Sequence, residues 1–189
     1  MHILFVCTGN QCRSVMAQYL AQTAIEQRHI SEEELGAGGL QASSAGTLHY
    51  PPAPADPMTL TMLKKDSIDA SAHQSTPIRP ELSSAADLIL CFEHEQIAEL
   101  LAQNPAAARK TFLFNDFVNI CAQLVRDGGI HGSNPGEKLH EAMESAGMLR
   151  PFLPQASETE DPHRKDRVVF ERVYAEIKRG ITTILNAVA

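Results

Sequence analysis

Short, continuous apolar segments alternate with helix-like segments along most of this chain. The segments that predict strands are residues 2–7, 40–45, 86–92 and 111–114. Apolar runs without polar alternation are typical of strands that are covered on both faces, as in a parallel sheet. The order strand, helix, strand therefore predicts an α/β fold. We expect a three-layer sandwich, in which helices cover both faces of a four-stranded parallel sheet.

The last segment of the chain has the clearest helix pattern. Its apolar residues, which share one helical face, are Phe170, Val173, Tyr174, Ile177, Ile181 and Ile184. This spacing is typical of a helix that packs one face on a sheet. Similar patterns predict helices over residues 13–27 and 56–65, and a further helix directly after residue 92.

Residues 119–158 interrupt this regular order. Glycines and prolines recur through the segment and leave room for one or two short helices around residues 137–147. A stretch of this length without a clear pattern is uncommon as a simple connection. We therefore predict one domain, residues 1–189, with an atypical insertion at about 119–158 that acts as a lid or is a variable addition.

Composition and charge limit the partners of the chain. A net charge of −7 disfavours nucleic acid and anionic membranes, because binding to either depends on neutralising phosphates. With no Trp and only 5% aromatic residues, the chain lacks the stacking surfaces of single-strand nucleic-acid binders. Its first apolar run is too short for a signal peptide or a membrane helix. We expect a cytoplasmic protein and favour a monomer, although the sequence leaves the oligomeric state open.

The cysteines suggest thiol chemistry rather than a structural framework. The four of them, at positions 7, 12, 91 and 121, form no C-x-x-C pair and have no histidine at metal-finger spacing. Neither a disulfide framework nor a structural zinc site is therefore expected.

The segment CTGNQCRS, residues 7–14, follows the first predicted strand. Parallel sheets bind ligands at this end of their strands. A loop whose backbone N–H groups point inward, followed by the positive N-terminus of a helix, binds a tetrahedral oxyanion. A cysteine at the centre of such a site, here Cys7, is ionised and nucleophilic near neutral pH. The segment therefore predicts a phosphate-binding loop that contains a thiolate nucleophile.

Other residues of this loop have predicted roles of their own. The planar guanidinium of Arg13 suits two non-bridging oxygens of a phosphoryl group. Ser14 can donate a hydrogen bond to the Cys7 thiolate, and Gly9 allows a tight turn. The residues predicted to surround the phosphate are Thr8, Gly9, Asn10, Gln11, Cys12, Arg13 and Ser14.

The loop with its preceding residue, VCTGNQCRS, resembles the C-x-G-N-x-C-R-S signature of the low-molecular-weight protein tyrosine phosphatases. Further segments that resemble this family are SSAGTLHY at 43–50, PADP at 54–57, ADLILCF at 86–92 and DPHRKDRVVFERVYAEI from 161. Only about 119–158 is left without a counterpart. The resemblance implies a cysteine-dependent phosphatase, without metal or other cofactor. Its substrate would be phosphotyrosine, an aryl phosphate ester, in tyrosine-phosphorylated proteins, hydrolysed through a phosphocysteine.

The resemblance also implies roles outside the loop. Asp161, in the Asp-Pro segment, is the general acid that protonates the departing phenol and then the base that activates water. Tyr50 lines the pocket for the aromatic ring of the substrate. Cys12 closes a disulfide with Cys7 under oxidant and protects it from irreversible oxidation. The network that holds the loop comprises Asn10, Ser14, Ser44 and His73.

The chain departs from the family pattern at several positions. Val15 stands where a proline is common, and Thr76 where an arginine is usual. His163 and Arg164 replace aromatic residues that often follow the Asp-Pro, so the wall of the substrate pocket that His163 forms is polar and basic. These replacements leave the substrate preference open.

Two other functions are compatible with such a loop. One is an arsenate reductase of the same fold, which passes a disulfide between thiols; Cys12 and Cys91 would be the candidates. No further cysteine occurs in the helix after Cys91, where the relay needs one. The other is a non-catalytic phosphotyrosine-binding module. A module without chemistry has no need of both Cys7 and Asp161.

Overall fold

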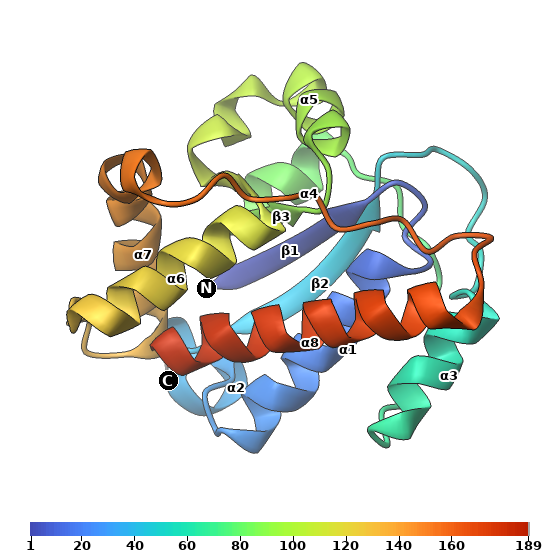
Figure 1. Cartoon of the computed structure of the whole chain (residues 1–189), viewed down its shortest axis with the longest axis horizontal. Helices are drawn as coiled ribbons and strands as arrows, with labels where there is room; N and C mark the ends of the chain where they lie inside the picture. Colours follow the sequence, from blue (N-terminus) through green and yellow to red (C-terminus); the bar gives the residue numbers. More distant parts are fainter. Residues whose placement is uncertain (189) are drawn as a thin grey trace.

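The computed structural model describes residues 1–188 and has a four-stranded parallel sheet at its centre (Figure 1). The strands are β1 (His2–Cys7), β2 (Gln41–Gly46), β3 (Leu88–Cys91) and β4 (Thr111–Leu113). Their order in the sheet is β2-β1-β3-β4. The register pairs Cys7 with Gly46, and Val6 with Cys91. The predicted parallel sheet is confirmed.

Helices cover both faces of the sheet, as the prediction required (Figure 1). The helices whose apolar residues join the larger core cluster are α1 (Arg13–Gln27), α3 (Pro57–Lys65), α6 (Phe114–Asp127), α7 (Pro135–Leu149) and α8 (Arg167–Val188). The opposite face is covered by α4 (Pro80–Ala85), α5 (His94–Gln103) and the 3-10 helix η2 (Pro105–Lys110). The short elements that remain are α2 (Glu32–Leu35), η1 (Gly36–Gly38) and η3 (Arg150–Phe152).

The continuous apolar run of β1 is explained by its central position in the sheet. Ile3 and Phe5 pack in the larger core cluster, whereas Leu4 and Val6 pack in the smaller cluster on the other face. Successive side chains of a strand point to opposite faces, so a strand covered on both sides needs apolar residues at every position.

Residues 119–158 are more regular than the sequence analysis predicted. Helix α6 begins at Phe114, directly after β4, and ends before Gly128, whose φ of 64° caps the helix in the left-handed conformation. Helix α7 is 15 residues long. Both bury apolar side chains against the core, among them Phe117 of α6 and Leu139 of α7. The predicted helix around 137–147 is confirmed as α7, but it is longer than expected, and α6, which enters the same segment, was not predicted. That the segment is an insertion relative to related chains stays a prediction.

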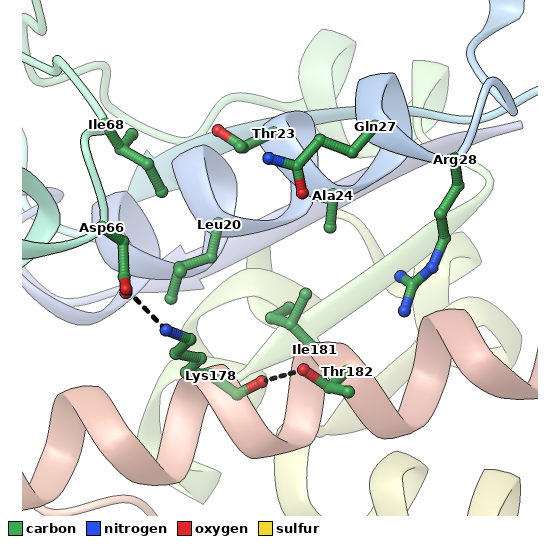
Figure 2. Close-up of a pocket in the computed structure, with 10 residues that line it drawn as sticks. All are labelled: Leu20, Thr23, Ala24, Gln27, Arg28, Asp66, Ile68, Lys178, Ile181 and Thr182. Carbon is green, nitrogen blue, oxygen red and sulfur yellow. Dashed lines mark hydrogen bonds and ion pairs between the residues drawn. The ribbon is translucent and has the colours of Figure 1, made fainter.

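A groove lies between α1 and α8, on the face of the sheet that carries the larger core cluster (Figure 2). Its charged groups are engaged with each other: Nζ of Lys178 lies 2.7 Å from Oδ1 of Asp66, and the hydroxyl of Tyr174 donates to Oδ2 of Asp66 at 2.6 Å. The bonds from Lys178 and Tyr174 lower the pKa of Asp66. Arg28, at the end of α1, donates to the side chain of Asn186 at 2.7 Å. These contacts fasten α8 to its neighbours.

Within residues 1–188 no helix combines the length and the apolar character that crossing a membrane requires. The cytoplasmic location stays a prediction.

Helices α6 and α8 approach each other closely at Gly180. A Cβ atom on Gly180 would lie 2.5 Å from Cζ of Phe114 and 3.0 Å from Cγ2 of Val118. The ring of Phe114 is fully buried and packs on Phe92, with ring centroids 5.2 Å apart. Because the core is close-packed, this ring has no free space into which it could move. Glycine is therefore required for the approach of the two helices.

We predict that Gly180→Ala lowers the free energy of unfolding by about 1–2 kcal/mol, because the cost of overpacking exceeds the gain in helix propensity. Gly147→Ala in α7 is the matched control, since a Cβ there meets no atom within 4 Å. The control should raise the free energy of unfolding by about 0.5–1 kcal/mol. Urea unfolding measures both, and a shift of both variants in the same direction contradicts the packing argument.

Candidate active site

Cys7, the last residue of β1, is buried at the start of the 7–14 loop. Its Sγ atom lies 3.0 Å from Oγ of Ser14, which is fully buried in the first turn of α1. The loop thus returns the chain to the end of the strand, and the N-terminus of α1 faces the cysteine. A hydroxyl at this distance can donate a hydrogen bond to a thiolate and stabilise it.

Asn10, rather than Gly9, has the unusual backbone conformation in the loop. The φ angle of Asn10 is 49°, in the left-handed region, whereas Gly9 is not among the residues with positive φ. The positive φ in the loop therefore lies one residue after Gly9. Asparagine adopts this conformation more readily than most residues because its short amide side chain can form local hydrogen bonds.

The side chain of Asn10 is the centre of a buried hydrogen-bond network. Its Nδ2 donates to Oγ of Ser14 at 2.9 Å and to Oγ of Ser44 at 2.8 Å. Its Oδ1 accepts from the backbone N–H of Thr76 at 2.8 Å. Ser44 in turn donates to Oε1 of Gln18 at 2.5 Å. Thr76 takes part through its backbone, so the replacement of an arginine at this position leaves the contact in place.

His73 supports the same residue from the other side. Its Nε2 lies 3.0 Å from the backbone carbonyl oxygen of Asn10, and its ring packs edge-on against Tyr19. Burial lowers the pKa of His73, although the bond to Asn10 acts in the opposite direction. A neutral ring can donate its Nε2–H to the carbonyl. Because the folded pKa is lowered, acid disfavours folding: as pH falls below about 6.5, the unfolded chain binds the proton more readily.

Arg13 is the most buried charged residue of the site, with a side chain that is 1% exposed. Its Nη1 donates to the backbone carbonyl of Thr159 at 2.9 Å. Its Nη2 lies 3.0 Å from Oε2 of Glu93 and 3.3 Å from Oδ1 of Asp161. Its Nε has no hydrogen-bond partner within residues 1–188. The Nε–H group is therefore available to bind an anion, while two loops hold the Nη1 and Nη2 end of the guanidinium.

The segment that carries Asp161 is anchored on both sides. The backbone N–H of Thr159 donates to the carbonyl of Phe92 at 3.1 Å, at the end of β3. The hydroxyl of Thr159 and the amide of Asn115 donate to Oε1 of Glu176, at 2.7 and 2.8 Å. These contacts connect the segment with α6 and α8, and they explain how Asp161 reaches the loop from a distant part of the chain.

Several residues that support the site were missed by the sequence analysis. Gln96 of α5 is buried and donates to Oγ1 of Thr8 at 3.1 Å. Its Oε1 accepts from the backbone N–H of Glu93 at 3.1 Å as half of a capping box. The spacing of Glu93 and Gln96 after an apolar run is the pattern of a capped helix start, and it could have predicted this arrangement.

Gly46 was also missed, although it belongs to the SAGT segment. A Cβ atom there would lie 2.8 Å from the carbonyl oxygen of Thr8 and 2.9 Å from the backbone nitrogen of Asn10. Backbone atoms cannot yield as the end of a side chain can. Glycine at this position therefore allows the loop to lie against the end of β2.

One pocket brings most of the predicted residues together, but Asn10 and Ser14, predicted to surround the phosphate, are fully buried and do not line it. The residues that line it are Cys7, Thr8, Gly9, Gln11, Cys12, Arg13, Leu48, Tyr50, Asp161 and His163. The hydroxyl of Tyr50 donates to the carbonyl of Gly9, so its ring stands over the loop. Nε2 of Gln11 donates to the carbonyl of Pro54 at 3.0 Å. His163 is exposed at the rim.

The other cysteines differ from Cys7 in their surroundings. All four are free thiols, so a disulfide between Cys7 and Cys12 stays a prediction. Burial raises the pKa of Cys12 above its ordinary value, and the negative charges of Cys7 and Asp56 add to this effect. Burial likewise raises the pKa of Cys91, and that of Cys121 to about 12. Cys91 packs in the core cluster on the opposite face of the sheet from Cys7.

We predict that Asn10→Gly and Asn10→Ala separate the two contributions of Asn10. Both remove the three side-chain hydrogen bonds, so both should lower the turnover of p-nitrophenyl phosphate at least about tenfold. Only alanine adds strain at positive φ, so Asn10→Ala should be less stable than Asn10→Gly by about 1 kcal/mol in urea unfolding. Equal stability of the two variants, or wild-type turnover in Asn10→Gly, would contradict the assignment.

Comparison with known proteins identifies the family of the chain. A family model described as low molecular weight phosphotyrosine protein phosphatase matches residues 2–143. The low molecular weight protein-tyrosine-phosphatase Etp of Escherichia coli strain K12 is 25% identical over 178 residues, which cover 94% of this chain and 88% of Etp. A protein-arginine-phosphatase of Bacillus subtilis strain 168 is 32% identical over 118 residues, 62% of this chain and 73% of the relative.

A solved structure is similar over the whole length. The crystal structure of the low molecular weight protein tyrosine phosphatase from T. tengcongensis matches with a TM-score of 0.68 and 27% identity, and the match covers 98% of each chain. The family model alone spans well over half of the sequence. The chain therefore belongs to the low molecular weight phosphotyrosine protein phosphatase family and is a phosphatase.

Proposed function

We propose that the protein hydrolyses phosphotyrosine in proteins, with Cys7 as the nucleophile, Arg13 as the group that holds the phosphoryl oxygens and Asp161 as the general acid. The observation that carries the proposal is that these three side chains line one pocket, although Asp161 lies far from the other two in sequence. A nucleophile, a cation that binds phosphoryl oxygens and a carboxyl group are the set that cleavage of a phosphate ester requires.

In the first step, the Cys7 thiolate attacks phosphorus in line with the departing phenol. The P–O bond breaks as the S–P bond forms, and Asp161 gives its proton to the phenol oxygen. The Arg13 guanidinium and the backbone N–H groups of the loop bind the equatorial oxygens, where charge is spread in the transition state. Ser14, 3.0 Å from Cys7, stabilises the sulfur as nucleophile and later as leaving group.

In the second step, water attacks the phosphocysteine and releases inorganic phosphate. Asp161, now ionised, takes the proton from the water, which restores the acid for the next cycle. The S–P bond breaks and Cys7 leaves as thiolate. Neither a metal nor another cofactor is needed for either step.

The walls of the pocket favour an aromatic substrate. Leu48 is about half exposed and lines the pocket together with Tyr50, so both offer apolar surface to a ring that stands above the loop. One relative is named a protein-arginine-phosphatase, which makes phosphoarginine the substrate to test against phosphotyrosine. Phosphoarginine carries a positive guanidinium, and beyond the phosphate it would meet the apolar Leu48 and Tyr50.

The arsenate reductase alternative is not supported by the positions of the thiols. Cys91 and Cys7 face opposite sides of the sheet, and α5, which follows Cys91, contains no cysteine. A disulfide relay requires sulfurs that can come within bonding distance in turn. The remaining alternative, a non-catalytic binding module, is an outcome of the following experiment.

We expect Cys7→Ser to abolish turnover of p-nitrophenyl phosphate while phosphate and vanadate still bind. Asp161→Asn should lower the turnover of phenyl phosphate by about 10²–10⁴-fold and that of p-nitrophenyl phosphate less, because p-nitrophenol leaves without full protonation. Binding without turnover in the wild type would show a binding module instead.

For the substrate class, we predict that kcat/KM for a phosphotyrosine peptide exceeds that for the matched phosphoarginine peptide at least about tenfold. Leu48→Ala should reduce this preference, because it removes apolar surface that serves the ring. Leu82→Ala is a suitable control, since Leu82 packs on the opposite side of the sheet. Equal or reversed preference in the wild type would assign the protein to phosphoarginine.

A further inference from the structure

Three side chains beside the pocket form a cluster that has no role in the two proposed chemical steps. The Sγ of Cys12, a carboxylate oxygen of Asp56 and an imidazole nitrogen of His163 all lie within 4.8 Å of one another. Ligands of a tetrahedral zinc ion are about 3.5 Å apart, given bonds of about 2.0–2.3 Å. A side-chain adjustment of about 1 Å would therefore bring the three groups into one coordination sphere.

Two of the three groups, His163 and Asp56, have lone pairs available to bind a metal ion. The imidazole of the exposed His163 makes no hydrogen bond to any residue from 1 to 188; only its backbone N–H is bonded, to Oδ1 of Asp161 at 3.2 Å. Asp56 uses Oδ1 to cap α3, where it accepts from the backbone N–H of Met58 at 2.8 Å. This bond orients the carboxylate and leaves its second oxygen available.

Cys12, the third group, lies near a buried hydroxyl that has no hydrogen-bond partner. Thr59 is completely buried, and its Oγ1 has no hydrogen-bond partner within the described residues. Its hydroxyl lies near the Cys12 thiol. A buried hydroxyl without a partner is costly. It would gain an acceptor if Cys12 were held as a thiolate.

We propose that Cys12, Asp56 and His163 bind one zinc ion at the mouth of the active-site pocket, and that this ion inhibits the phosphatase. A thiolate, an imidazole and a carboxylate form the mixed ligand set that zinc prefers, whereas magnesium and calcium bind to oxygen ligands. Three protein ligands leave the fourth position to water.

Binding of the ion is a proton exchange without redox change. Zn²⁺ displaces the proton of the Cys12 thiol, which is released to solvent, and the Zn–S bond replaces the S–H bond. Cys12 and His163 also line the pocket that contains Cys7. The ion would therefore obstruct the path of the substrate to Cys7 and compete with it.

Metal binding is best measured in the Cys7→Ser protein, which offers no catalytic thiolate. We expect calorimetric titration with ZnCl₂ to show one ion per chain, and titration with MgCl₂ to show none. His163→Phe, Cys12→Ala and Asp56→Asn should each weaken zinc binding at least about tenfold. Asparagine retains the oxygen that caps α3. His140→Phe, on the exposed face of α7, is the matched control and should bind zinc as its parent does.

A spectroscopic readout identifies the sulfur ligand. Co²⁺ in place of zinc should produce near-ultraviolet thiolate-to-cobalt absorption in the Cys7→Ser protein, and Cys12→Ala should remove it. Unchanged zinc affinity in both His163→Phe and Cys12→Ala would overturn the proposal. Zinc binding that needs Cys7, and is lost in Cys7→Ser, would overturn it as well, because the ion would then sit on the nucleophile.

The inhibitory consequence rests on the proposed function, whereas binding does not. In the wild type, ZnCl₂ should raise the apparent KM for p-nitrophenyl phosphate, and EDTA should reverse the effect. His163→Phe should need at least about tenfold more zinc for the same inhibition, measured relative to its own rate without zinc. If the protein has no phosphatase activity, the binding titrations still decide the metal site; if zinc fails to bind, the phosphatase assignment is untouched.

Discussion

The active site depends on the ion pairs and hydrogen bonds of the buried Arg13 guanidinium. A charged group that is 1% exposed must be paired and hydrogen-bonded, because the loss of its hydration would otherwise be prohibitive. Its partners come from two segments distant in sequence, Glu93 after β3 and the Thr159–Asp161 stretch before α8. The arginine thereby joins the 7–14 loop to the segment that carries Asp161, the proposed general acid. An anion at Nε would complete a hydrogen-bonding set that the protein leaves unfinished.

Around this arginine the loop is held rigidly by neutral polar groups. The backbone of Asn10 is strained at a φ of 49°, and hydrogen bonds from its side chain to Ser14, Ser44 and Thr76 offset this strain. His73 forms a hydrogen bond with its carbonyl oxygen. A network of this kind orients the loop N–H groups before the substrate arrives, so little reorganisation is needed in the transition state.

The rim of the pocket is less constrained than its base. Leu48, Tyr50 and His163 come from loops, where replacement costs little stability. Replacements at the rim can therefore alter the preferred substrate without disturbing the loop. His163 places an imidazole next to Cys12 and Asp56. The proposed zinc site thus follows from a single replacement at the rim.

The sequence by itself determined the parts of the protein that depend on neighbouring residues. Continuous apolar runs specified strands covered on both faces, and the residues of the 7–14 loop, contiguous in the chain, carried the signature of the nucleophile and the arginine. Helix α6 could also have been predicted, because its buried residues have helical spacing. It was missed because the glycines and prolines that follow it obscured the pattern.

Only the tertiary structure decided which distant groups meet at the site. Glu93, Gln96 and Thr159 are unremarkable in sequence, and their importance arises from contacts across the sheet ends. The same holds for the left-handed conformation of Asn10, which is imposed by partners more than 30 residues away. Local patterns record propensity and burial, whereas the pairing of buried polar groups depends on where the folded chain brings them together.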